Sequence, residues 1–177
     1  IVAEHLLPAE GGLVDHKNRL VNLHGEGGIG KTRLAQALCD LLEDYRHFPG
    51  GIFEIDCEPV PDANQLAVTM LQAIGVASAE QIPHPAEMLA AALQEISNSK
   101  GDVLLMLDNV DPLFDADKVV ETCRLLKQLF TDCPSLRILT TCRRQLQLGG
   151  CESDFLVDPL APQIAVSLFI QSIPNQD

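Results

Sequence analysis

Two periodicities of apolar residues alternate along this chain. Short apolar runs, typical of β-strands, are separated by longer segments in which apolar residues recur at every third or fourth position, as on one face of a helix. The runs predict strands at residues 20–24, 52–57, 103–107, 136–141 and 155–157. The periodic segments predict helices with the apolar stripes Leu34–Leu38–Leu41–Tyr45, Leu66–Met70–Ile74, Leu89–Leu93–Ile96 and Val119–Cys123–Leu126–Phe130. Ala35, Ala37 and Leu42 lie beside the first of these stripes, and a last helix opens at Pro162 and carries Ala165, Leu168 and Phe169.

The alternation of strands with helices indicates the fold class. Strands joined by helices form parallel sheets with right-handed crossovers. The run from Val103 to Leu107 contains no polar residue, which suits a strand buried on both faces. We therefore expect an α/β fold in which a parallel β-sheet is sandwiched by helices, a three-layer αβα arrangement.

The first 18 residues show neither periodicity. Pro8, Gly11 and Gly12 interrupt them, and a polar run follows at residues 15–18. We interpret residues 1–18 as a linker or N-terminal extension; a segment lying near a bound base is the alternative. The chain begins with Ile1 rather than Met and stops inside an apparent helix–loop region, so we expect a fragment of a longer multidomain protein.

A glycine-rich segment follows the first predicted strand and matches the phosphate-loop pattern G-x-x-x-x-G-K-[ST] at every fixed position. Such a loop wraps its backbone N–H groups around phosphates, and a helix that begins at about Gly30 presents its positive dipole end to them. The predicted nucleotide-binding residues are Gly25, Glu26, Gly27, Gly28, Ile29, Gly30, Lys31, Thr32 and Arg33. Lys31 would face the β- and γ-phosphates, and the Thr32 hydroxyl would ligate Mg²⁺. A glycine-rich turn that binds nothing is the alternative, and the strand before the loop and the helix after it disfavour it.

Asp108 ends the apolar strand at residues 103–107. An aspartate in this position accompanies the phosphate loop and holds Mg²⁺ directly or through water. The predicted metal ligands are therefore Thr32 and Asp108. A turn-forming aspartate at a strand end is the alternative.

Hydrolysis needs a further group that orients or deprotonates the attacking water. Asn109 is a poor base, so we expect hydrolysis to be slow. Asp111 can fill the role if its loop turns it inward, and it can equally be a turn residue before Pro112.

Arg143 lies just past the predicted strand at residues 136–141, on the same loop edge of the sheet. From there a guanidinium can reach the γ-phosphate and report whether ATP or ADP is bound. A solvated arginine is one alternative, and the neighbouring Arg144 in the same role is another. The predicted catalytic residues are thus Asp108, Asp111 and Arg143.

Four segments together resemble the nucleotide-binding domain of the STAND class of P-loop ATPases, which includes the NB-ARC domains of plant resistance proteins and apoptotic scaffolds. They are Leu23–Thr32, beside the family's G-x-G-G-I/V-G-K-T; Leu104–Val110, beside L-L-V-L-D-D/N-V; Leu136–Arg143, beside a strand ending in T-T/S-x-R; and Asp158–Leu160 with Ala165–Phe169, beside P-L-x-x-x-x-A-x-x-L-F. The resemblance runs from about residue 19 to 171. It departs from the family at Asn109, where many members carry a second acid. It implies a P-loop NTPase fold and a P-loop nucleotide-binding domain over residues 19–177.

The resemblance also implies a molecular switch. In that family an ADP-bound closed state converts to an ATP-bound state that self-associates, and slow, Mg²⁺-dependent ATP hydrolysis controls the conversion. For this chain it implies an adenine nucleotide, ATP or ADP, with Mg²⁺ as cofactor, in a multidomain signalling or regulatory protein. The alternatives are a working ATPase or nucleotide kinase with rapid turnover, a motor-type ATPase on nucleic acid, and a degenerate scaffold that holds nucleotide structurally. The absence of an N/T-K-x-D motif from the sequence favours adenine over guanine.

Charge and cysteine usage narrow the remaining possibilities. The chain has 12 Lys+Arg against 25 Asp+Glu, a net charge of −13, which disfavours nucleic acid or an anionic membrane as a partner of this domain. No apolar run is long enough to predict a membrane-spanning helix. The six cysteines contain no C-x-x-C pair, so zinc spacing is absent and reduced, mostly buried thiols in a cytoplasmic protein are expected.

Overall fold

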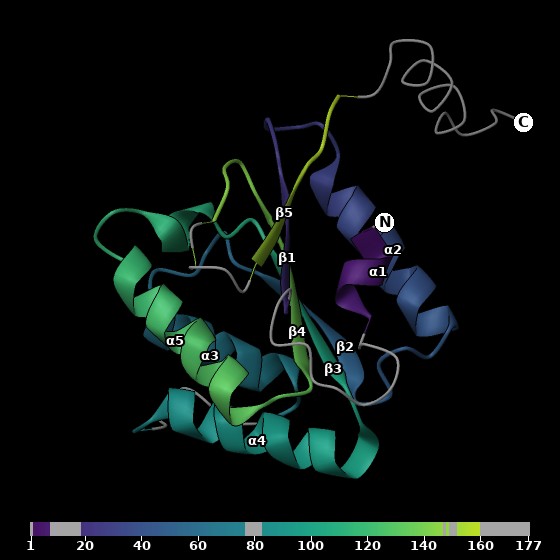
Figure 1. Cartoon of the computed structure of the whole chain (residues 1–177). Coiled ribbons are helices and arrows are strands. Elements are labelled where there is room, and N and C mark those ends of the chain that lie inside the picture. The colour runs from purple at the N-terminus through teal and green to yellow at the C-terminus, as the bar shows by residue number, and fades with distance from the viewer. Residues whose placement is uncertain (1, 8–18, 77–82, 147, 149–151, 160–177) are drawn as a thin grey trace, which may run out of the picture.

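A computed structural model describes residues 2–7, 19–76, 83–146, 148 and 152–159 of the chain. Its centre is a five-stranded sheet with the strand order β2-β3-β4-β1-β5. Every strand pairing is parallel. Helices cover both faces of the sheet: α1 and α2 lie on one side, and α3, α4 and α5 on the other (Figure 1). The predicted α/β class with a parallel sheet between two helical layers is confirmed.

The elements follow the predicted order with small shifts at their ends. The strands are β1 (Leu20–His24), β2 (Gly51–Asp56), β3 (Val103–Asp108), β4 (Leu136–Cys142) and β5 (Glu152–Leu156). The helices are α1 (Val2–Leu6), α2 (Lys31–Asp44), α3 (Ala63–Ala73), α4 (Pro85–Lys100) and α5 (Val119–Asp132), with a short 3₁₀ helix, η2 (Asp111–Phe114), that the apolar pattern did not predict. The helix predicted from Pro162 lies outside the described residues.

The sheet separates two cores. Side chains alternate between the faces of a strand, so a strand buried on both sides contributes to each core in turn. In β3, Leu105 packs with the residues of α3, α4 and α5, whereas Leu104 and Met106 pack with those of α1 and α2. In β4, Ile138 and Leu139 divide in the same way. This alternation explains the unbroken apolar run of the central strand.

Only Leu38 of the apolar stripe predicted for α2 packs against the core. Leu34, Leu41 and Tyr45 are 45%, 46% and 70% exposed. The residues that α2 buries against the sheet are Ala35, Cys39 and Leu42. The small side chains of Ala35 and Cys39 allow the helix to lie close to the strands, and periodicity alone does not distinguish two neighbouring apolar stripes on one helix.

Part of the N-terminal segment packs on the sheet. Leu6 of α1 is fully buried in the core shared with α2, and the His5 ring stands edge-on to Phe155 of β5 with the ring centroids 5.0 Å apart. Residues 2–6 thus form a helix that packs on the sheet, and the interpretation of residues 1–18 as a linker or N-terminal extension stays a prediction. Residues 8–18 lie outside the described part of the chain.

Candidate functional site

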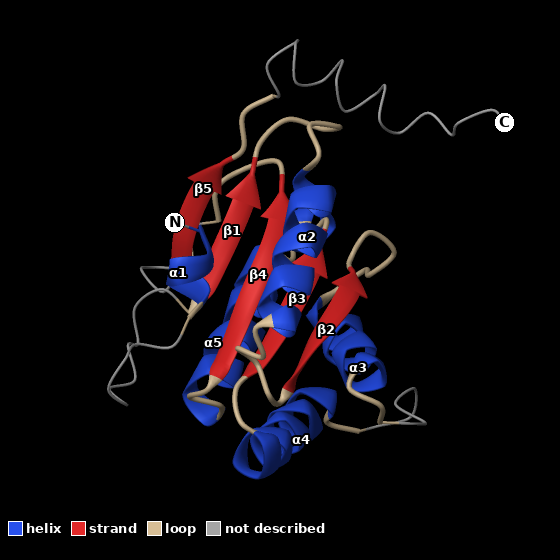
Figure 2. Cartoon of the chain, turned by 90° about the vertical axis from the view of Figure 1, so that its right-hand side faces the viewer, coloured by secondary structure: helices blue, strands red, loops and turns tan. Residues whose placement is uncertain are grey.

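The candidate site residues are brought to one edge of the sheet. Since all the strands are parallel, their carboxyl ends share an edge, and ligands of open α/β sheets bind beyond such ends. Figure 2 shows the strand arrows pointing the same way, with the loop from β1 to α2 at the arrowhead edge. Asp108 ends β3 and Arg143 follows β4 at this edge. Residues far apart in the sequence therefore meet through topology.

The phosphate loop depends on glycine at particular positions. Gly25, Gly28 and Gly30 have φ of 153°, 79° and 99°, a region that side chains with a Cβ rarely adopt. A Cβ on Gly25 would also lie 2.6 Å from both the Ile29 Cδ1 atom and the Val157 carbonyl oxygen. The Val157 N–H donates to the His24 carbonyl at 2.8 Å, so the start of the loop packs against the segment that follows β5.

The residues that close the loop lie at the start of α2. Gly30 is the N-cap of this helix, as predicted, so the first N–H groups of α2 and its positive dipole end point toward the loop. The Lys31 ammonium donates to the carbonyls of Gly25 and Glu26 at 2.9 and 2.7 Å. Arg33 is exposed in the first turn. A cation, a helix N-terminus and a glycine backbone thus converge, which suits an anionic ligand.

The two predicted metal ligands are in contact. The Thr32 hydroxyl donates to the two carboxylate oxygens of Asp108, at 2.9 and 3.1 Å. Hydroxyl and carboxylate oxygens are ligands that Mg²⁺ accepts, so the pair fits this ion. Within the described ranges no cluster of three or more His, Cys, Asp or Glu side chains forms a metal site. Mg²⁺ held here would therefore complete its shell with water and phosphate oxygens, as it commonly does.

Thr141, at the end of β4, is a site residue that the sequence analysis missed. Its hydroxyl donates to Asp108 Oδ1 and accepts the main-chain N–H of Asn109 at 2.9 Å. Its carbonyl accepts the N–H of Val110 at 3.0 Å. Asn109 reaches this position with φ of 57°. The available sequence signal was a pair of threonines near the end of the strand, the second of them two positions before Arg143.

Asp111 and Arg143 are also brought together, through the backbone of the arginine. The Arg143 N–H donates to the carboxylate oxygens of Asp111 at 3.0 and 3.2 Å. The exposed Arg143 side chain makes no hydrogen bond or ion pair with any residue that the structure describes. The neighbouring Arg144 is engaged elsewhere: its guanidinium donates to the Phe114 carbonyl at 2.7 Å and lies 3.4 Å from an Asp115 oxygen. Arg143 is therefore the better placed of the two to reach a ligand.

A buried polar network fastens the segment after β4. Asn22 of β1 is fully buried, and its amide donates to Asp154 at 2.5 Å and to the Arg144 carbonyl at 3.3 Å. The Asn22 carbonyl accepts the Thr140 hydroxyl at 3.0 Å. Asp154 also accepts the Leu146 N–H at 3.4 Å. A single asparagine in an apolar strand was the available sequence signal, and its partners could not be read from the sequence.

The described thiols do not contribute reactive groups. Burial raises the pKa of both Cys39 and Cys57 to about 12, with nearby carboxylates adding to the effect. Burial likewise raises the pKa of Cys142, at the end of β4. These groups stay protonated near neutral pH, as expected for structural cysteines. Cys151 lies outside the described residues.

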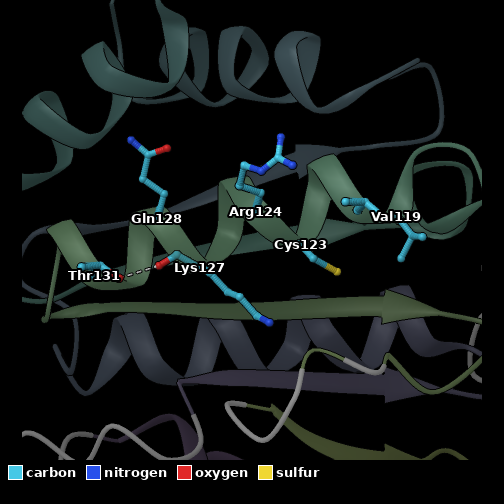
Figure 3. A pocket seen from close by; sticks show the side chains of 7 residues that line it. Val119, Cys123, Arg124, Lys127, Gln128 and Thr131 are labelled. Atoms are coloured by element: carbon cyan, nitrogen blue, oxygen red, sulfur yellow. Dashed lines mark hydrogen bonds between the residues drawn. The ribbon is translucent and has the colours of Figure 1, made fainter.

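A separate hollow of about 620 Å³ lies along the outer face of α5. Val119, Cys123, Arg124, Lys127 and Gln128 contribute to its lining. Figure 3 shows that these side chains project from a single helix, with Arg124 and Gln128 on one side and Cys123 and Lys127 on the other. No strand end or phosphate-loop residue lines it, so this hollow is not the site that the motifs predict.

A membrane span is not found among the described helices, because none is long and apolar enough to cross a bilayer.

Comparison with known proteins identifies the family of this chain. Residues 14–148 match the model of a family described as an AAA domain. A putative HTH-type transcriptional regulator of Mycobacterium tuberculosis is 31% identical over 134 residues, which are 76% of this chain and 14% of that protein. An ORC1-type DNA replication protein of Haloarcula marismortui is 28% identical over 105 residues, 55% of this chain and 26% of that protein. The chain thus spans only a small part of the length of these relatives.

Solved structures confirm the fold. A Walker-type ATPase of Pyrococcus abyssi superposes with a TM-score of 0.61 at 16% identity, over 86% of this chain and 52% of that one. The structure of the Aeropyrum pernix ORC1 protein in complex with DNA superposes with a TM-score of 0.67 at 17% identity, over 86% of this chain and 43% of that one. At such identity the likeness shows the fold alone. The comparisons bear out a P-loop ATPase and do not distinguish the narrower STAND class.

Proposed function

This chain belongs to the AAA domain family, and from that premise we propose that it is an ATP/ADP-binding switch domain of a multidomain regulatory protein of the STAND class. One observation carries the proposal: the Thr32 hydroxyl lies 2.9 Å from the Asp108 carboxylate, beside a glycine loop closed by Lys31. The predicted metal ligands, the glycine loop and a cation therefore lie at one edge of the sheet, which supports the proposal. In this proposal the nucleotide-binding domain covers residues 19–177.

Different residues of the site would bind different parts of the nucleotide. The backbone of residues 25–30 and the first turn of α2 would bind the phosphates, and Lys31 would neutralise the β- and γ-phosphates. Thr32 and Asp108 would hold Mg²⁺, which supplies charge neutralisation to the bridging phosphate oxygens when bound. Arg143, exposed and close to the same edge, would contact the γ-phosphate and so distinguish ATP from ADP.

Slow hydrolysis follows from the residues beside Asp108. Asn109 carries an amide, which is a poor base, and its main chain is held by Thr141 in a left-handed conformation. A site that binds ATP well and hydrolyses it slowly suits a switch, because the ATP-bound state persists long enough to act. Self-association in the ATP-bound state of the longer protein completes the proposal and follows the STAND resemblance.

A second candidate is an ATPase that works with DNA. It is favoured by the ORC1-type relative and by the similar structure determined in complex with DNA. The net charge of −13 weighs against DNA contact through this domain, since phosphates attract basic surfaces. Contacts made by other domains of a longer protein would satisfy both observations.

The experiment is a turnover measurement on the 177-residue chain with Mg²⁺-ATP, with and without duplex DNA. The switch account expects release of less than about one phosphate per minute per chain, unaffected by DNA, compared with about 10 s⁻¹ for a typical enzyme. Turnover at that typical rate would favour the working ATPase. Stimulation of about tenfold or more by DNA would favour the second candidate. Light scattering of the longer protein with ATP and with ADP tests the self-association, which equal masses in both would contradict.

A further inference from the structure

The contacts of Asp111 suggest a role other than proton transfer. Its two carboxylate oxygens lie 3.0 and 3.2 Å from the main-chain nitrogen of Arg143. A carboxylate that accepts a backbone N–H fixes the position of that backbone through a charge-assisted hydrogen bond. We propose that Asp111 is a positioning residue that couples the metal-binding loop after β3 to the segment carrying Arg143. The inference rests on the proposed function, because it assigns the coupling to the same nucleotide site.

Asp111 completes a set of main-chain contacts that we call the β3–β4 clasp. The clasp consists of three hydrogen bonds. The Asn109 N–H donates to the Thr141 hydroxyl, the Val110 N–H donates to the Thr141 carbonyl, and the Arg143 N–H donates to the Asp111 carboxylate. It continues the contact between the two strands beyond the end of their ladder. The loop after β3 and the end of β4 are therefore held together at successive residues.

The clasp begins at the predicted metal site. The Thr141 hydroxyl that accepts the Asn109 N–H also donates to the Asp108 carboxylate, and the same carboxylate accepts from Thr32. A shift of Asp108 on binding a metal–nucleotide complex would move Thr141 and the loop after β3 together. Asp111 then transmits that movement to the backbone of Arg143. The charge that senses the γ-phosphate is thereby linked to the ligands of the metal.

The competing role for Asp111 is that of general base. A base must offer an oxygen to the attacking water at hydrogen-bonding distance. In this structure both oxygens are directed at one main-chain N–H, and the residue is half-buried at the start of η2. The variant Asp111→Asn separates the two roles, because its amide oxygen still accepts the Arg143 N–H but cannot take up a proton.

The test compares ATP affinity, ADP affinity and phosphate release for the wild-type chain, Asp111→Asn, Asp111→Ala, Arg143→Ala and the double variant Asp111→Ala/Arg143→Ala. Asp117→Ala is the matched control, since it removes the same charge from an exposed position in the same loop. We expect Asp111→Ala to weaken ATP binding about 5- to 10-fold and ADP binding less than about twofold, the size of one lost charge-assisted hydrogen bond. Asp111→Asn should weaken ATP binding less than Asp111→Ala does, because its amide oxygen keeps a neutral hydrogen bond to the Arg143 N–H, and the Asp117→Ala control should stay within about twofold of wild type in affinity and in rate. The double variant should be no worse than Arg143→Ala, because both changes remove one coupled unit.

Two results would overturn the inference. If Asp111→Asn loses phosphate release as fully as Asp111→Ala while both bind ATP normally, Asp111 is the base. If Asp111→Ala matches wild type in its ATP-to-ADP affinity ratio, the clasp does not position Arg143. Thermal unfolding verifies folding, and should Asp111→Ala not fold, the comparison of Asp111→Asn with Arg143→Ala still decides between base and positioning residue. A wild-type chain that binds no nucleotide would overturn the proposed function and this inference together. If the wild-type chain binds nucleotide and one of the two results above is found, only the role proposed for Asp111 is overturned.

Discussion

The loop after β1 and the loops after β3 and β4 form the same edge of the sheet by different means. The phosphate loop takes its shape from backbone conformation, with glycines at positive φ and a helix that starts at once. The β3–β4 clasp takes its shape from side chains that reach across the sheet, such as Asp111 to Arg143 and Thr141 to Asp108. Local constraint therefore builds the part that holds phosphate, and long-range contacts build the part proposed to sense it.

This difference suggests how stability and response are distributed. A loop locked by its own backbone geometry can hold one shape before the ligand arrives. Loops held by a few hydrogen bonds can shift at modest cost, because each such bond contributes only about 1 kcal/mol net. A switch needs both a rigid binding element and an adjustable one.

The largest effect is expected at Gly25, where backbone and packing constraints coincide. Gly25→Ala would place a Cβ 2.6 Å from the Val157 carbonyl and strain a residue with φ of 153°. We expect a loss of about 3 kcal/mol in the free energy of unfolding, measured by urea denaturation. Gly27→Ala is the matched control: nothing lies within 4 Å of its Cβ, and its φ is not in the positive region. Equal stability of the two variants would break the claim that the phosphate loop is fixed by its backbone.

A smaller loss of stability is expected on replacing Asn22, whose side chain donates a hydrogen bond to the segment after β4. Asn22→Ala would remove the acceptor that lies 3.0 Å from the Thr140 hydroxyl and the amide that donates to the Asp154 carboxylate, leaving each group with a longer hydrogen bond of 3.4 Å, to the Val21 carbonyl and from the Leu146 N–H. We expect a loss of about 2 kcal/mol in the free energy of unfolding, because buried polar groups without partners are costly. Hydrogen exchange should quicken at the Leu146 amide, whose acceptor is Asp154. The control Asn98→Ala, at an exposed position, should change neither the free energy of unfolding nor the hydrogen exchange of Leu146. If Asn22→Ala also changes neither quantity, side chains do not hold this segment.

The smallest effect is expected from the thiols, each of which reports opening of the segment around its own cysteine. At pH 8 an alkylating reagent should modify half-buried Cys123 before the buried Cys57 and Cys142, which mass spectrometry of digested protein resolves. Asn22→Ala should quicken modification of Cys142, whose thiol donates to Asn22 and to the Arg144 carbonyl, and leave Cys57 unchanged. Equal quickening at Cys57 would indicate global opening rather than release of one segment.

The same thiols set a direction for stability at alkaline pH. The pKa of Cys39 and of Cys57 is about 12 in the folded chain, against a model-compound value of 9.0. The unfolded thiols therefore ionise first, and ionisation favours unfolding. Their contribution to the free energy of unfolding is fully present below pH 9.0 and declines as the pH rises toward about 12. Urea denaturation as a function of pH measures this decline, which the double variant Cys39→Ser/Cys57→Ser should reduce.

The same contrast decides how much could be predicted from the sequence. The strands, the helix order and the phosphate loop were predicted because periodicity, glycine spacing and helix starts are local signals. Asp108 was located by the strand that it ends. Thr141 and Asn22 were missed, since their importance depends on residues about 30 and more than 100 positions away. The buried face of α2 was predicted only in part: Ala35 and Leu42 were placed beside the apolar stripe and Cys39 was not, because periodicity alone does not separate two neighbouring stripes on one helix.

The most direct test of the account is a calorimetric titration of the chain with ATP, ADP and GTP in the presence of Mg²⁺, beside Lys31→Ala. Lys31 is half-buried at the phosphate loop, and its ammonium donates hydrogen bonds to the backbone carbonyls of Gly25 and Glu26, so its removal should leave the fold intact. The account predicts that wild type binds adenine nucleotides in preference to GTP and that Lys31→Ala binds them at least about 100-fold more weakly, a loss of about 2.7 kcal/mol, with unchanged thermal unfolding. Equal affinity in wild type and Lys31→Ala would contradict the assignment of this edge of the sheet as the nucleotide site.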